Sequence, residues 1–134
     1  MMVEGLNYLT AEEVVEYNKS VLDKIKVKKA DGHKVIAEGA LRFVMEECKG
    51  KQGDIYDVAV FLLKNLIQKH PFASGNRRTA WIAAERFLER NNHKLNVDNT
   101  REQVRVLQGI RENYYAEEEI KKWLTTGRIR KFKR

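Results

Sequence analysis

Apolar residues recur every three or four positions along most of the chain, which is the spacing of one face of an α-helix. The first such segment covers residues 10–25, with apolar side chains at Val14, Val15, Tyr17, Val21, Leu22 and Ile25. Thr10 and Glu13 stand three positions apart, as in a capping box, and Leu9 and Val14 have the spacing of a hydrophobic staple. The pattern therefore predicts a helix that begins at Thr10.

Two more helical segments follow, over 34–48 and 55–69, separated by the connectors 26–33 and 49–53. The inward face of the first is expected to hold Val35, Ile36, Ala40, Phe43 and Val44. Asp54 is expected to cap the second, whose inward face runs through Ile55, Val58, Ala59, Leu62 and Leu66. His70 stands four positions after Leu66, so the spacing predicts that it continues this inward face at the helix end.

Pro71 ends that helix, because its ring and its missing N–H do not fit a helix interior. The next helical pattern covers 79–92, and we expect its helix to start near Gly75 or Asn76. Two further helical patterns follow over 97–110 and 114–124. No stretch favours more than a very short strand. The pattern predicts an all-α fold of about six helices, with one domain over 1–127 and a basic tail over 128–134.

Of the features of composition, the distribution of charge along the chain adds most to this prediction of the fold. The formal net charge is +7, but five of the 26 basic residues lie in the last seven positions, "RIRKFKR". The domain itself is therefore nearly neutral, and the excess is expected in a solvated tail or in one that contacts nucleic acid, a ribosome or an acidic partner. No apolar run approaches the ~20 residues of a membrane span, and the N-terminus lacks a signal-peptide pattern. A single cysteine, Cys48, fits a reducing cytoplasm.

One short stretch, residues 70–80 or "HPFASGNRRTA", contains a histidine, a proline, a glycine, an asparagine and two adjacent arginines. Read physically, this stretch is a loop that enters a helix, and a helix N-terminus offers unpaired backbone N–H groups to an anion. Gly75 permits a close approach of the backbone, Asn76 can cap the helix and donate to a phosphate oxygen, and Arg77 and Arg78 add positive charge. A histidine at the edge of such a phosphate cradle suits general-base work. The competing interpretation is that His70 and Asn76 cap two helices and that the arginines lie on the surface.

This stretch also resembles the signature of the Fic/Doc (Fido) family, His-Pro-Phe-x-Asp/Glu-Gly-Asn-Gly/Lys-Arg. The resemblance extends over about residues 8–125, through "YLTAEEVVEYNKSVL", "DVAVFLLKNLIQKHPF" and "YAEEEIKKWL". It implies an all-α Fido fold with a central helix–loop–helix that carries the motif. It also implies ATP as a substrate and Mg²⁺ as a cofactor.

The resemblance gives each matching position a role. His70 matches the catalytic histidine that deprotonates the target hydroxyl, and Phe72 matches the buried anchor of the loop. Gly75 and Asn76 match the anion-hole positions, and Arg78 matches the phosphate-binding arginine. The segment 49–54, "KGKQGD", either corresponds to the flap that pins the target peptide in the family or is an ordinary turn between helices.

Three positions depart from the signature. Arg77 stands where AMP-transferring members have glycine and Doc-type members have lysine. Trp81 stands where AMP-transferring members carry a second arginine. Both departures favour the Doc branch, whose reaction moves a phosphate from ATP onto a protein hydroxyl. Ser74 replaces the carboxylate that holds Mg²⁺, and its neutral hydroxyl is a weaker ligand for that cation.

Three functions follow as hypotheses. The first is a Doc-like transferase that phosphorylates a Ser, Thr or Tyr hydroxyl of a target protein and is the toxin of a toxin–antitoxin pair. The second is an AMP-transferring Fic enzyme, against which Arg77 and Trp81 argue. The third is a degenerate Fido domain that acts as a binding module, which Ser74 favours.

Overall fold

The computed structural model describes residues 5–25, 34–98 and 100–133. Over these ranges the chain forms six helices: α1 (Ala11–Ile25), α2 (Glu38–Gly50), α3 (Ile55–Lys69), α4 (Asn76–Arg90), α5 (Arg101–Arg111) and α6 (Glu117–Thr126). An isolated antiparallel bridge joins Val35 to Phe72. None of the described helices is long and apolar enough to cross a bilayer. The predicted all-α class is confirmed.

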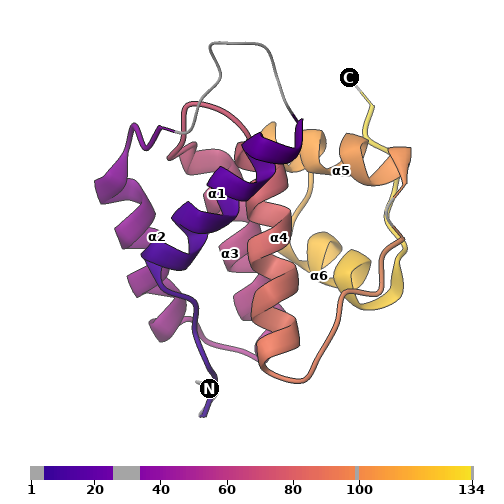
Figure 1. Ribbon diagram of the computed structural model, residues 1–134. Helices are drawn as coiled ribbons and strands as arrows, with labels where there is room; N and C mark the ends of the chain where they lie inside the picture. The colour runs from indigo at the N-terminus through magenta and orange to yellow at the C-terminus, as the bar shows by residue number, and fades with distance from the viewer. Residues whose placement is uncertain (1–4, 26–33, 99, 134) are drawn as a thin grey trace.

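Helix α3 lies at the centre of the fold and contacts α2, α4, α5 and α6. Figure 1 shows α1 and α2 on one side of the α3–α4 pair and α5 and α6 on the other. Helix α3 is apolar on more than one face, as expected of a core helix. Its buried residues are Ile55, Val58, Ala59, Val60, Leu62, Leu63, Leu66 and Ile67. The motif therefore begins directly after α3, the most buried of the described helices.

The predicted capping signals at α1 and α3 are confirmed. At α1, the backbone N–H of Glu13 donates to Thr10 Oγ1 and the backbone N–H of Thr10 donates to Glu13 Oε1. At α3, Asp54 accepts from the backbone N–H groups of Tyr56 and Asp57, and the Asp57 carboxylate accepts from the Asp54 N–H in return. These side chains satisfy donors that a helix leaves unpaired at its first turn.

Helix α2 begins at Glu38 and not at residue 34, and the expected inward positions of Ile36 and Phe43 are wrong. Their exposed fractions are 55% and 54%. The backbone of residues 34–37 is held by the motif loop, so it cannot join the helix. The buried face of α2 consists of Leu41, Val44, Met45 and Cys48, and Phe43 lies outside it with Lys69 Nζ 5.8 Å from its ring centroid.

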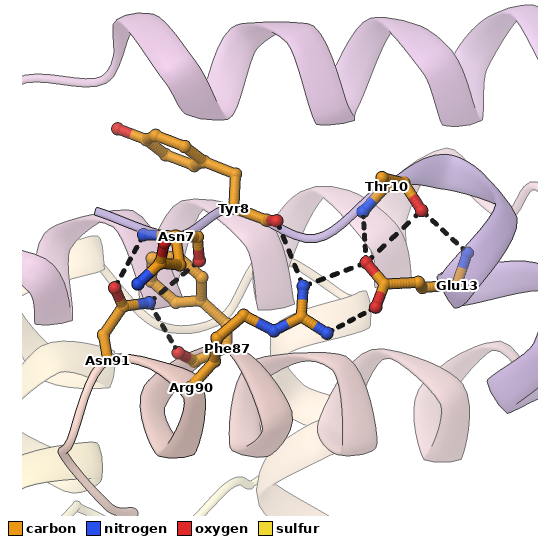
Figure 2. A network of polar contacts seen from close by, with 7 residues as sticks. All are labelled: Asn7, Tyr8, Thr10, Glu13, Phe87, Arg90 and Asn91. Atoms are coloured by element: carbon orange, nitrogen blue, oxygen red, sulfur yellow. Dashed lines mark hydrogen bonds and ion pairs between the residues drawn. The ribbon is translucent and has the colours of Figure 1, made fainter. Parts of the chain in front are cut away.

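The segment before α1 is tied to the end of α4 by the polar network in Figure 2. Arg90 forms an ion pair with Glu13 and donates from Nη1 to the carbonyl oxygen of Tyr8 at 3.2 Å. Asn91 accepts from the backbone N–H of Asn7 and donates back to the carbonyl oxygen of Asn7. The same Glu13 that caps α1 thus also pairs α1 with α4, which sets the position of α1 over the motif helix.

The C-terminal segment is not the solvated tail that its charge favoured. Phe132 is buried, and its ring centroid lies 5.1 Å from that of Tyr114. Arg130 pairs with Glu119 and lies over the Tyr114 ring. A Cβ on Gly109 would meet Tyr115 at 2.6 Å and Phe132 at 3.1 Å, so glycine at this position lets the segment pack against α5. The segment is therefore held against α5 and α6 at Phe132 and Arg130.

Candidate functional site: a cavity at the start of helix α4

His70 terminates α3 in a left-handed conformation, with φ 53° and ψ 56°. This conformation is uncommon for a residue with a side chain, and such residues are concentrated at functional sites. The left-handed turn directs the chain out of the α3 axis, and His70 is exposed. The expectation that His70 continues the inward face of α3 is therefore wrong, because the helical spacing stops applying where the helix ends.

Asn76 closes the motif loop on itself. Its Oδ1 accepts from the backbone N–H of Phe72 at 3.0 Å, and its Nδ2 donates to the carbonyl oxygen of Phe72 at 2.8 Å. Phe72 is 1% exposed, in agreement with the anchoring role that the resemblance implies. Because both polar atoms of Asn76 bond to Phe72, its side chain holds the loop rather than standing free for a ligand.

Helix α1 holds the same loop from the other side through Asn18. Asn18 is fully buried, and its Nδ2 donates to the carbonyl oxygen of Ser74 at 2.9 Å and to Thr79 Oγ1 at 3.1 Å. Gly75 has φ 77°, and a Cβ there would lie 3.3 Å from Asn18 Nδ2. The sequence analysis missed Asn18, although an amide among the apolar positions of α1 is the kind of signal that marks a buried polar contact.

Residues 34–37 pair with the motif loop from a third direction. The backbone N–H groups of Ile36 and Ala37 donate to the carbonyl oxygen of Pro71, and the N–H of Ala73 donates to the carbonyl oxygen of Lys34. Of the two interpretations of segment 49–54, the ordinary turn fits the structure and the flap does not, because that segment precedes α3 whereas the motif follows it. Helix α3 has 15 residues, which separates its two ends by roughly 20 Å.

A cavity of about 410 Å³ opens in front of the motif loop. It brings together most of the predicted site residues: His70, Ser74, Gly75, Asn76, Arg77 and Arg78. Phe72 lies behind the loop and is absent from the lining. The opposite wall comes from α5 and includes Arg111, which the sequence analysis did not single out because nothing in the local sequence links it to the motif.

The start of α4 is open toward an anion. Gly75 is the N-cap residue and has no side chain to accept from the first N–H groups of the helix, and no hydrogen bond from another described side chain caps them. Such N–H groups and the positive end of the helix dipole favour negative charge. Within the part of the chain that the structure describes, three guanidinium groups and one imidazole line the same cavity. The arrangement can bind a phosphate group beside a side chain that is able to accept a proton.

The residues present do not fit a protein-bound Mg²⁺ ion. That cation takes oxygen ligands and favours carboxylates, and no carboxylate is found among the described residues that line the cavity. Ser74, at the position that the family signature gives to a carboxylate, contributes one neutral hydroxyl. The described residues also hold no group of three or more His, Cys, Asp or Glu side chains suited to a metal. We therefore assign no step to a protein-held metal.

Comparison with known proteins points to one family. The profile of the Fic/DOC family matches residues 8–88, a range that includes α1, α2, α3, the motif loop and most of α4. A curated relative, Toxin Doc of Mycolicibacterium smegmatis, is 43% identical over 44 residues, which are 33% of this chain. The match spans about a third of that relative, 34% of its length. With a family match over more than half of its length and the motif folded around one cavity, the chain belongs to the Fic/DOC family.

Proposed function

We propose that this protein is a Doc-like transferase that moves the terminal phosphate of ATP onto a hydroxyl group of a target protein. The observation that carries the proposal is the cavity itself. It combines the open N-terminus of α4 with Arg77 and Arg78, and it places His70 on its lining. Phosphate transfer depends mainly on positioning and on charge stabilisation, which are the two properties this cavity offers.

In the proposed step, the target hydroxyl oxygen attacks the terminal phosphorus atom. The new P–O bond forms as the bond between that phosphorus and the bridging oxygen breaks, and ADP leaves. His70 accepts the proton of the hydroxyl. The backbone N–H groups at the start of α4, together with the guanidiniums, stabilise the negative charge that spreads over the transferred group.

Two residues favour transfer of phosphate over transfer of AMP. Arg77 supplies a cation where AMP-transferring members have glycine. Trp81 stands in the place of their second arginine and packs on Trp123, with ring centroids 5.2 Å apart. The site therefore lacks the guanidinium that the AMP-transferring signature puts at this position.

A role as the toxin of a toxin–antitoxin pair forms part of the proposal. It is supported by the resemblance to the Doc branch and by the name of the similar protein, Toxin Doc. In this role the partners are a target protein with a reactive hydroxyl and a small antitoxin that covers the site.

Labelled ATP tests the reaction. The protein is incubated with a lysate and with ATP labelled at either the α or the γ phosphate. We expect γ label on a protein band, none from α label, and loss of transfer in His70→Ala. His93→Ala is the matched control, since His93 is exposed and does not line the cavity. Transfer of α label, or full transfer by His70→Ala, would contradict the proposal.

A binding module is the second candidate, and Ser74 is the observation that favours it. In that case neither label is transferred, while a partner is still captured from the lysate. Ser74→Asp separates the two candidates, because it restores a carboxylate to the cavity. A gain of Mg²⁺-dependent transfer in Ser74→Asp over an inactive wild type would identify this chain as the binding form.

A further inference from the structure

Ser74 and His70 both line the cavity in front of the motif loop, which we call the motif cavity. The backbone of Ser74 is fixed, because its carbonyl oxygen accepts from Asn18 Nδ2 at 2.9 Å. Its hydroxyl forms no hydrogen bond to another residue that the structure describes. The hydroxyl of Thr79 differs, since that residue is 1% exposed and its oxygen accepts from the same amide group. Of these two hydroxyls, that of Ser74 is the one open to a molecule in the cavity.

The motif cavity carries positive charge that no acidic side chain balances. Among its described lining residues, Arg77, Arg78 and Arg111 are cationic and none is a carboxylate. None of these arginines forms an ion pair with a described acidic residue. Ser74 directly precedes Gly75, the N-cap residue of α4, so the uncapped N–H groups of that helix begin beside it. A phosphate group attached to Ser74 would therefore meet both hydrogen-bond donors and cations.

We propose that Ser74 is a site of self-phosphorylation, at which the protein transfers the terminal phosphate of ATP to its own motif loop. The inference rests on the proposed function, since it uses the same ATP and the same base. The Ser74 hydroxyl oxygen attacks the terminal phosphorus atom, and the new O–P bond forms as the bond from that phosphorus to the bridging oxygen breaks. ADP leaves with the electron pair of that bond, and His70 accepts the proton of the serine hydroxyl.

The phosphoserine inhibits the protein that formed it. It carries a charge of about −1.5 to −2 at neutral pH, and a phosphate at a helix N-terminus beside arginines gains charge-assisted hydrogen bonds. Because it is attached to the loop, it competes for the cavity at an effective concentration on the order of millimolar. It therefore displaces the phosphates of ATP from Arg77, Arg78 and the start of α4. Serine in place of the carboxylate of the family signature thus makes the activity self-limiting.

Mass spectrometry of the full chain, incubated alone with ATP, tests the modification. We expect the chain to gain the mass of one phosphoryl group, and we expect peptide analysis to place that group on Ser74. Neither Ser74→Ala nor His70→Ala should take up phosphate. Ser20→Ala is the matched control and should be modified like the wild type, because Ser20 is the other serine of the chain, is exposed and does not line the cavity.

Calorimetric titration with inorganic tripolyphosphate tests the inhibition. Protein that has been incubated with ATP and then freed of nucleotide should bind tripolyphosphate about tenfold more weakly than fresh protein, since the attached phosphate takes up charge-assisted contacts. Treatment with a phosphatase should restore the affinity. In Ser74→Ala the affinity should be the same before and after the incubation. Phosphate on Ser74 without a loss of affinity would refute the inhibition.

The outcomes separate this inference from the proposed function. Transfer of γ label to a lysate protein without phosphate on Ser74, or uptake of phosphate at another residue of the chain, would overturn the inference and leave the proposed function in place. Phosphate on Ser74 without label on a lysate protein would support the inference and contradict transfer to a target. Absence of phosphate from both Ser74 and the lysate proteins would overturn both.

Discussion

Asn18 in α1 donates a hydrogen bond to the carbonyl oxygen of Ser74 over 2.9 Å, although the two residues are 56 positions apart. The same amide group also donates to Thr79 Oγ1 in the first turn of α4. Helix α1 is in turn held to the far end of α4 by the pairing of Glu13 with Arg90 (Figure 2). The shape of the motif loop therefore depends on a helix none of whose described residues lines the motif cavity.

Replacement of Asn18 tests this dependence. Asn18→Asp keeps the size of the side chain but removes the donor and places a carboxylate against the carbonyl oxygen of Ser74. We expect a loss of about 2–3 kcal/mol in the free energy of unfolding, since a buried carbonyl loses its partner, together with weaker ATP binding. Urea unfolding and calorimetry measure the two effects. Asn92→Asp is the control at an exposed site, and an Asn18→Asp variant with wild-type stability and affinity would refute the role.

Arg111 is expected to bind phosphate from the α5 side of the motif cavity. Arg111→Gln should weaken tripolyphosphate binding about tenfold, because one charge-assisted contact is lost, and should also reduce the salt dependence of the affinity. The comparison variant is Arg101→Gln, on the same helix but outside the cavity. Equal affinities for these two variants would remove Arg111 from the site.

Glu13 should make the stability dependent on pH in the acidic range. The hydrogen bond with Arg90 lowers the pKa of Glu13 from 4.5 to about 2. A depressed pKa in the folded state adds stability above the unfolded pKa, and this stability is lost as the pH falls from about 4.5 to 2. Because the pair is about a third exposed, solvent screening reduces the expected contribution to about 1 kcal/mol.

Urea midpoints for the wild type and Glu13→Gln, measured between pH 7 and pH 2, test this expectation. The difference between the two proteins should be largest at neutral pH and should shrink toward pH 2. Glu16→Gln serves as the control, since Glu16 lies on the same helix and pairs with Lys19 in a solvent-exposed position. A difference that stays constant across the range would show that the charge of Glu13 does not stabilise the contact.

Phe132 should contribute to stability despite its position near the C-terminus. Phe132→Ala removes a buried ring that packs beside Tyr114 and Gly109, at an expected cost of about 2–4 kcal/mol. Phe43→Ala is the matched control because Phe43 is 54% exposed. Thermal and urea unfolding measure both variants. Equal small losses would restore the interpretation of residues 128–133 as a solvated tail.

The spacing of apolar residues and the signals at helix ends were enough to predict the all-α class and the approximate number of helices along the chain. The caps at Thr10 and Asp54 and the inward face of α3 form as their spacing indicates, because these contacts lie within a few residues of one another. The predicted site residues other than Phe72 likewise line one cavity, since they are close neighbours along the chain. Local chemistry of this kind can be read directly from the order of the residues.

One departure, that of His70, comes from the end of a helix, and the others involve contacts between distant parts of the chain. His70 leaves the face of α3 because the helix ends there, Ile36 is exposed because its backbone pairs with Pro71, and Phe132 is buried because Gly109 admits it. Asn18 and Arg111 reach the site from α1 and α5, and no spacing along the chain connects them with residues 70–80. Order along the chain thus specified the helices and the motif, whereas the packing of helices remote in sequence decided which side chains surround that motif.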